Sequence, residues 1–129
     1  MNWTNYPDSL SVDELLEKLA ADQITDYKEY LLFNAYEFQE KLCAIYEKLK
    51  AEDTVVLNLY NPNLDSGDDL LVAMTIDGDY IIEQNKTTLV VPVSLEAAAV
   101  EVYPYPAVQF LKAYTNKQIT SNILADIID

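Results

Sequence analysis

The sequence predicts one acidic α+β domain over residues 1–129: an N-terminal pair of helices, a central antiparallel meander of about four strands, and C-terminal helices packed on the sheet. Two periodicities predict this class. Apolar residues recur every three or four positions up to residue 51 and again after Pro106, whereas between residues 54 and 93 they alternate or form short runs. Half of the residues are apolar, so a chain of this length can bury a core.

Two helices are predicted before the sheet. The first covers residues 11–21, where Ser11 and Glu14 form the S-x-x-E pattern of a capping box. The second covers residues 25–51, and its apolar side chains are again three or four positions apart: Tyr27, Leu31, Ala35, Phe38, Leu42, Ile45 and Leu49.

Four strand-like segments follow: Thr54–Tyr60, Leu70–Ile76, Tyr80–Glu83 and Thr87–Val93. The continuous apolar run of the second segment is typical of a central strand. The dipeptide Asp77-Gly78 that follows it is a hairpin signal. Pro92 has no amide proton to donate, so the fourth segment lies at a sheet edge or its strand ends there.

The last third of the chain carries mixed signals. In residues 94–103 the alanines favour a short helix, whereas Val100-Glu101-Val102-Tyr103 favours a strand, and both interpretations stay open. Pro106 suits the first turn of a helix that continues to about Tyr114. A last helix is predicted over residues 117–128 from the spacing of its isoleucines and leucine.

The charge of the chain excludes some classes of partner. It has 22 acidic residues against 8 lysines, no arginine and no histidine, and a net charge of −14. Direct nucleic-acid binding needs a basic patch, and an anionic membrane surface would also repel this chain. We therefore expect no direct nucleic acid and no membrane as partners, and a basic protein as the electrostatic partner. The general alternative is that the charge serves only solubility.

The N-terminal residues lack the charged and apolar regions of a secretory signal, and the chain has a single cysteine, Cys43. We therefore expect a cytoplasmic protein.

Residue types that most active sites require are missing. Only two glycines are present, and the glycine-rich nucleotide-binding motifs are therefore absent from the sequence. Without histidine, and with one cysteine, there is neither a nucleophile–histidine pair nor a zinc site. We expect no catalytic residue, no cofactor and no metal, and hence no enzyme. Two alternatives stay open: catalysis by lysine or carboxylates, and a calcium loop beginning at Asn61, which departs from the EF-hand pattern at Ser66 and Val72.

The segment from Glu52 to Glu83 contains eight acidic residues and no lysine. Pairing of its predicted strands would bring the acids together at the two ends of the sheet, and nearby tyrosines are good anchors for a protein interface. The alternative is that Asp and Asn stand there because they favour turns. The predicted partner-binding residues are Glu52, Asp53, Tyr60, Asp65, Asp68, Asp69, Asp77, Asp79 and Tyr80.

The seven residues Asp26-Tyr27-Lys28-Glu29-Tyr30-Leu31-Leu32 resemble a helical segment of SUKH-type immunity proteins. In that family a glycine-containing turn follows, whereas here Phe33-Asn34-Ala35-Tyr36 continues the helical pattern, so the resemblance identifies no family. The acidic composition is also similar to that of phage-encoded inhibitors and toxin-immunity proteins.

These observations predict a non-catalytic binding or inhibitor protein that covers a basic protein surface, of the immunity, anti-restriction or nucleic-acid-mimic type. The alternative is a structural or assembly module of a phage or bacterial accessory kind that forms a homo-oligomer. The expected state in solution is a monomer or a homodimer.

Overall fold

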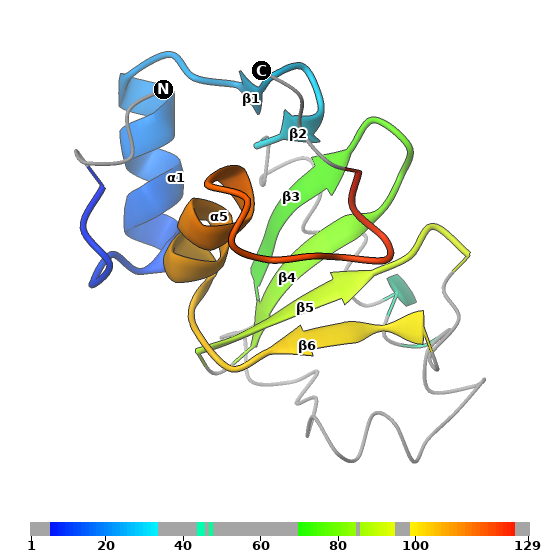
Figure 1. The fold of residues 1–129 in the computed structure, drawn as a ribbon. Coiled ribbons are helices and arrows are strands. Elements are labelled where there is room, and N and C mark those ends of the chain that lie inside the picture. Colours follow the sequence, from blue (N-terminus) through cyan, green and yellow to red (C-terminus); the bar gives the residue numbers. More distant parts are fainter. Residues whose placement is uncertain are drawn as a thin grey trace.

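The computed structural model describes residues 6–33, 44–45, 47, 70–84, 86–94 and 99–125. Within these residues an antiparallel sheet has the order β1-β2-β3-β4-β5-β6 and is accompanied by the helices α1 and α5 (Figure 1). The strands are β1 Asp26–Tyr27, β2 Leu31–Leu32, β3 Leu70–Thr75, β4 Tyr80–Gln84, β5 Thr87–Val91 and β6 Glu101–Tyr103, and the helices are α1 Val12–Ala21 and α5 Ala107–Thr115. The α+β class is confirmed, but the sheet in the described part of the chain has six strands instead of about four.

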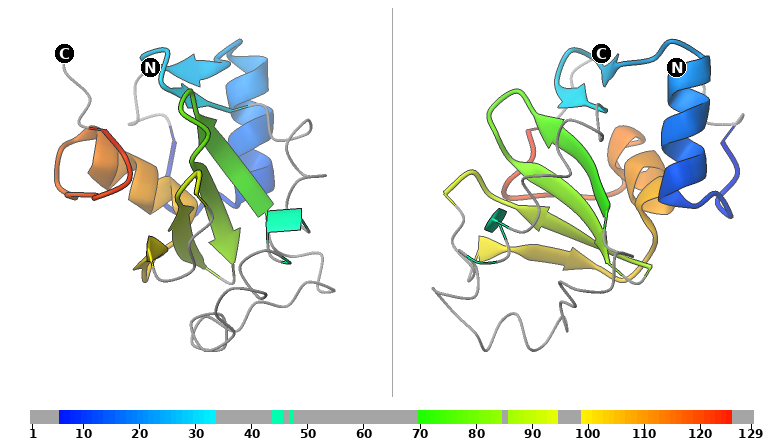
Figure 2. Two further views of the ribbon diagram at one scale, coloured as in Figure 1. Left: turned by 90° about the vertical axis from the view of Figure 1, so that its right-hand side faces the viewer. Right: turned by 180° about the vertical axis from the view of Figure 1, so that it is seen from behind.

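Both faces of the sheet are buried, which explains why its strands are rich in apolar residues on both sides. The larger core joins α1 and α5 to one face, which presents Val72, Ala73, Ile81 and Val90. The smaller core lies on the other face and includes Ile45, one of the helical residues on that side (Figure 2).

A bulge in β3 adapts this strand to the two cores. The register with β4 shifts between Leu71 and Ala73, so Val72 is an extra residue on its strand. Strict alternation would point Val72 and Ala73 to opposite faces, yet both are fully buried in the larger core. The bulge therefore lets two consecutive residues fill one face.

The first predicted helix is confirmed as α1. The Ser11 hydroxyl accepts a hydrogen bond from the Glu14 amide at 3.2 Å, and the Glu14 carboxylate accepts one from the Ser11 amide at 3.1 Å. These two contacts satisfy amides that an uncapped helix leaves unpaired. The buried side of α1 carries Val12, Leu15 and Leu19.

The predicted second helix, residues 25–51, is wrong at its beginning, where β1 and β2 form a hairpin. Lys28 and Glu29 have φ values of +54° and +59°, the two left-handed residues of a type I′ turn. The Asp26 carboxylate accepts a hydrogen bond from the Glu29 amide at 2.8 Å. The segment that resembles a SUKH-type helix is therefore not helical. Farther along, Ala44, Ile45 and Glu47 are helical, and the rest of the range beyond Phe33 lies outside the described residues.

The centre of the predicted meander is confirmed. Strand β3 is an interior strand, and the Asp77-Gly78 turn joins it to β4, with Gly78 at φ +96°. Strand β5 ends at Val91, directly before Pro92, and pairs with β6 on its far side, so it is not an edge strand. The predicted strand Thr54–Tyr60 lies outside the described residues.

The two open interpretations of residues 94–103 are settled in part by β6, because residues 101–103 form a strand. Helix α5 begins where Pro106 predicts it, with that proline as the N-cap residue.

The predicted last helix is wrong over residues 117–125, which are not helical; residues 126–129 lie outside the described part. Lys117 has a φ of +61°, and the chain then leaves α5 and crosses the sheet (Figure 1). Hydrogen bonds to distant parts of the fold hold this C-terminal segment, which is defined here as residues 118–125. Its apolar side chains still reach the larger core, since Leu124 is buried there.

Candidate protein-binding face

The turn between β3 and β4 is held by side-chain hydrogen bonds as well as by its backbone. The Thr75 hydroxyl accepts hydrogen bonds from the amides of Asp77 (3.2 Å) and Asp79 (3.1 Å) and donates one to the Asp79 carboxylate at 3.1 Å. The other oxygen of that carboxylate accepts a hydrogen bond from the Val93 amide at 2.9 Å. Asp79 therefore ties the turn to the segment that follows β5.

Two aliphatic side chains remain exposed on the turn and on this segment. Ile76 is 62% exposed and Val93 is 59% exposed, and among the described residues these are the exposed large apolar side chains. Val93 lies over the turn, because a Cβ added to Gly78 would be 3.0 Å from its Cγ2 atom. Asp77, which directly follows Ile76 in the chain, is also exposed. We call Ile76, Asp77 and Val93 the turn face.

The β1–β2 turn lies beside the turn face, since the Ile76 amide donates to the Tyr30 carbonyl at 3.0 Å. It adds the exposed Lys28 and Glu29, whose charges offset each other. The Tyr30 hydroxyl accepts a hydrogen bond from the Ala125 amide at 2.9 Å. Burial raises the pKa of Tyr30, and the charges of Asp79 and Asp77 raise it further, so this phenol stays neutral.

A groove opens next to the turn face, between the ends of the central strands and the C-terminal segment. Its volume is about 580 Å³, and two carboxylates, those of Asp79 and Glu101, line it together with the apolar side chains of Pro92, Val100 and Ile123. We call it the turn-side groove. In Figure 1 the β3–β4 turn, the segment after β5 and the C-terminal segment lie at the same end of the sheet.

Glu101 builds one wall of this groove. Its Oε1 atom accepts hydrogen bonds from the hydroxyls of Tyr103 (2.8 Å) and Ser121 (2.5 Å), and its Oε2 atom accepts one from the Asn122 amide at 2.8 Å. Burial raises the pKa of Tyr103 to about 12, and the contact with the Glu101 carboxylate adds to the rise. The phenol therefore keeps its proton and remains a donor to Glu101.

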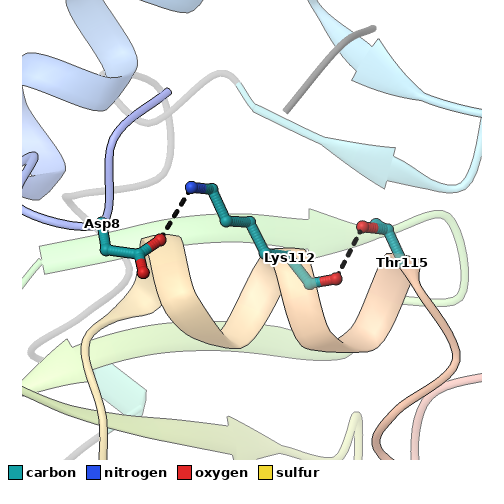
Figure 3. Close-up of polar contacts among 3 residues, drawn as sticks. All are labelled: Asp8, Lys112 and Thr115. Atoms are coloured by element: carbon teal, nitrogen blue, oxygen red, sulfur yellow. Dashed lines mark hydrogen bonds and ion pairs between the residues drawn. The ribbon is translucent and has the colours of Figure 1, made fainter. Parts of the chain in front are cut away.

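A second cavity, of about 570 Å³, lies along the exposed side of α5. Its lining includes Lys112 and Asp8, which form an ion pair at 2.7 Å, and Figure 3 shows Lys112 reaching from the helix to that carboxylate. One turn farther along, the Thr115 hydroxyl donates to the Lys112 carbonyl at 3.2 Å (Figure 3). Asp8 is 60% exposed, so the pair is well solvated and contributes about 0–1 kcal/mol.

The structure places three of the nine predicted partner-binding residues. Asp77 is exposed on the turn face. Asp79 is only 6% exposed, and its carboxylate accepts hydrogen bonds from Thr75 and Val93. Its contacts are therefore within the chain, where they hold the turn to the segment after β5. Tyr80 is half-buried and packs against the smaller core. The other six lie outside the described residues: Glu52, Asp53, Tyr60, Asp65, Asp68 and Asp69.

Sequence reasoning missed Ile76, Val93 and Glu101. Ile76 and Val93 stood at the ends of predicted strands, Leu70–Ile76 and Thr87–Val93, and neither position indicated a binding residue. Glu101 had a usable signal, because a single acid between Val100 and Val102 needs a polar partner when a strand is half-buried. That signal does not name the partner, which is 20 residues away at Ser121.

Within the described residues, no group of three or more acidic or cysteine side chains is arranged to hold a metal ion. None of the helices in that part of the chain is long and apolar enough to cross a membrane.

Comparison with known proteins gives no family to which the chain can be assigned: no family model, no curated protein and no solved structure matches it.

Proposed function

We propose that this chain is a non-catalytic protein that binds a basic protein surface through the turn face, in the manner of an immunity protein, an anti-restriction inhibitor or a nucleic-acid mimic. The observation that carries the proposal is the exposure of Ile76 on the β3–β4 turn and of Val93 on the segment that Asp79 ties to this turn. Side chains on a segment that hydrogen bonds already hold lose less entropy on binding, and exposed apolar side chains supply contact area to a partner.

Electrostatics supports a basic partner in particular. The net charge of −14 attracts cationic proteins over long range and repels nucleic acid and anionic membranes. At the turn face itself, Asp77 is exposed, and the two carboxylates of the adjacent groove accept hydrogen bonds from neutral donors. A cationic partner would meet negative charge beside an apolar contact. Complementary charge of this kind raises the rate of association and the specificity of binding.

Capture of partners from a lysate of the source cell tests the proposal. Wild-type chain should capture a basic protein at low salt and lose most of it at high salt, because screening shortens the reach of exposed charges. Ile76→Ser combined with Val93→Ser should abolish the capture while the thermal unfolding of the chain stays close to that of wild type.

A matched pair of charge variants separates the turn face from the net charge. Asp77→Lys and Glu17→Lys change the net charge equally, but Glu17 is exposed on α1, away from the turn face. Asp77→Lys should weaken binding of the captured protein at least about tenfold, and Glu17→Lys by less than about threefold. Equal weakening by the two variants would contradict the assignment of the turn face.

The alternative is an assembly module, and the same exposed pair favours it, since Ile76 and Val93 could meet in a homodimer. Repulsion between two chains of charge −14 opposes this at low salt. Light scattering distinguishes the two: a dimer that Ile76→Ser with Val93→Ser dissociates would support the assembly module, and a monomer would support the binding protein.

A further inference from the structure

The turn-side groove has walls of a kind that suits a long side chain with a charged end. Pro92, Val100 and Ile123 supply apolar surface, and a volume of about 580 Å³ admits a whole side chain with part of its backbone. The exposed Val93 stands at one side of the groove, because it directly follows Pro92 and its amide donates to Asp79. A partner that covers Val93 on the turn face therefore brings its neighbouring side chains to the groove.

Among the described residues that line the groove, two are acidic and none is cationic. The carboxylates of Asp79 and Glu101 accept hydrogen bonds from hydroxyls and amides, all of them neutral donors. None of the described residues that line the groove is a lysine. The described lysines with printed contacts lie elsewhere: Lys112 pairs with Asp8, and Lys18 stands 5.2 Å from the ring centre of Tyr6.

We propose that the turn-side groove receives a lysine or arginine side chain of the basic partner, with its aliphatic stem against Val100 and Ile123 and its cationic end between Asp79 and Glu101. This inference rests on the proposed function and names the chemistry that the partner contributes. Lysine and arginine suit the groove because their stems prefer apolar surface while their ends need negative charge. A shorter or neutral side chain would leave the two carboxylates without a counter-charge.

Titration of the isotopically labelled chain with a defined probe tests the inference by nuclear magnetic resonance. The probe is acetyl-Leu-Arg-Leu-amide at low ionic strength, and its matched control carries citrulline, which has nearly the shape of arginine without the charge. The arginine peptide should shift the amide signals of Val93, Glu101, Asn122 and Ile123. The citrulline peptide should bind at least about tenfold more weakly, because citrulline keeps donor groups but lacks the positive charge that the two carboxylates attract.

Two lysine variants locate the binding without touching the hydrogen-bond network. Ala99 is exposed and lines the groove, so Ala99→Lys places a cation of the chain itself at the site. Ala21→Lys makes the same change at an exposed position at the end of α1. Ala99→Lys should weaken binding of the arginine peptide about tenfold and Ala21→Lys less than twofold. Thermal unfolding of both variants checks that the fold is intact.

Equal binding of the two peptides, signal shifts confined to other acidic surfaces, or equal weakening by the two lysine variants would overturn the inference. These failures are distinguishable from failure of the proposed function. If only the groove inference is wrong, the captured protein still depends on Ile76 and Val93 but not on Ala99→Lys. If only the proposed function is wrong, the arginine peptide binds the groove while no basic protein is captured.

Discussion

At the scale of single residues, three buried or half-buried acids accept hydrogen bonds from neutral donors and join separate parts of the fold. Asp79 accepts from Thr75 and Val93, Glu83 from the first amide of α5, and Glu101 from three donors. The sequence shows these acids only as part of a large negative charge. The structure distinguishes acids with different roles. A buried carboxylate needs hydrogen-bond donors and thereby joins two segments, whereas a solvated carboxylate does not.

Replacing Asp79 should be the most destabilising of the acidic substitutions. Asp79→Ala leaves the part-buried Val93 amide and the buried Thr75 hydroxyl without their acceptor, so we expect a loss of about 2–4 kcal/mol in the free energy of unfolding. Asp77→Ala is the control, since that side chain is exposed, and it should change stability by less than about 0.5 kcal/mol. Urea denaturation measures both, and similar values would contradict the role assigned to Asp79.

The carboxylate of Glu83 makes stability depend on pH in an unusual direction. Its Oε1 atom accepts a hydrogen bond from the Ala107 amide at 2.8 Å. Burial nevertheless raises its pKa above the ordinary value of 4.5. The protonated form is therefore favoured by folding, and this contribution is lost as the pH rises through the raised pKa.

Glu83→Gln keeps an acceptor for the Ala107 amide and removes the charge. The free energy of unfolding of this variant should rise relative to that of wild type as the pH increases from about 4 to about 7. Glu83→Ala should instead lose about 1 kcal/mol across that range, because the first amide of α5 loses its cap. Denaturation at several pH values measures both, and a Gln variant that loses stability relative to wild type as the pH rises would contradict the sign.

At the scale of elements, local signals predicted α1, β3, β4 and the start of α5, and they failed between Asp26 and Leu32. Asp26 accepts a hydrogen bond from the amide three residues later, which is also the signature of a helix N-cap. Tyr27 and Leu31 fit the spacing of a helix, yet they are partners across a hairpin. The same local pattern thus fits a helix and a hairpin, and the pairing of β2 with β3 favours the hairpin.

Glu29→Gly distinguishes the hairpin from the predicted helix. In the hairpin Glu29 has a φ of +59°, which costs a non-glycine residue roughly 1 kcal/mol, so glycine should maintain or raise stability by up to about 1 kcal/mol. In a helix the same change would lower stability by about 1 kcal/mol. Glu17→Gly within α1 is the control that should show this loss. Thermal unfolding of the two variants gives the comparison.

The C-terminal segment should loosen without Glu101. Glu101→Ala removes the acceptor of the Ser121 hydroxyl and the Asn122 amide, while the contacts of Ala125 with Tyr30 and Tyr114 remain. We expect hydrogen exchange at Asn122 to become at least about tenfold faster, with little change in β4 and β5. Equal acceleration throughout the sheet would show that the substitution destabilises the whole fold instead of this segment.

At the scale of the whole molecule, 22 acids against 8 lysines produce repulsion that the fold must tolerate. The melting temperature should rise by roughly 3–6 °C between about 20 mM and about 500 mM sodium chloride, because salt screens this repulsion. Potassium chloride should have the same effect, since ionic strength is what matters. A melting temperature that stays constant or falls would mean that net repulsion does not limit stability.

The sequence by itself determined what depends on composition and on residues within about four positions of each other. These are the net charge, the capping box at Ser11 and Glu14, the Asp77-Gly78 turn and the apolar strands on either side of it. The sequence predicts these features correctly because the groups that interact in them are neighbours in the chain. Of the predicted binding residues, Asp77 is exposed in the turn that this local pattern predicts.

Only the tertiary structure decided the hairpin of β1 and β2, the path of residues 118–125 and the groove beside Val93. Each depends on partners far apart in the chain: Glu101 meets Asn122 across 21 positions, and Tyr30 meets Ala125 across 95. An acid or a tyrosine within an apolar stretch of sequence indicates that the side chain will need a hydrogen-bond partner. Which residue becomes that partner depends on which strands pair and which faces pack. Hydrophobic spacing cannot choose between these arrangements when the same side chains are buried in both.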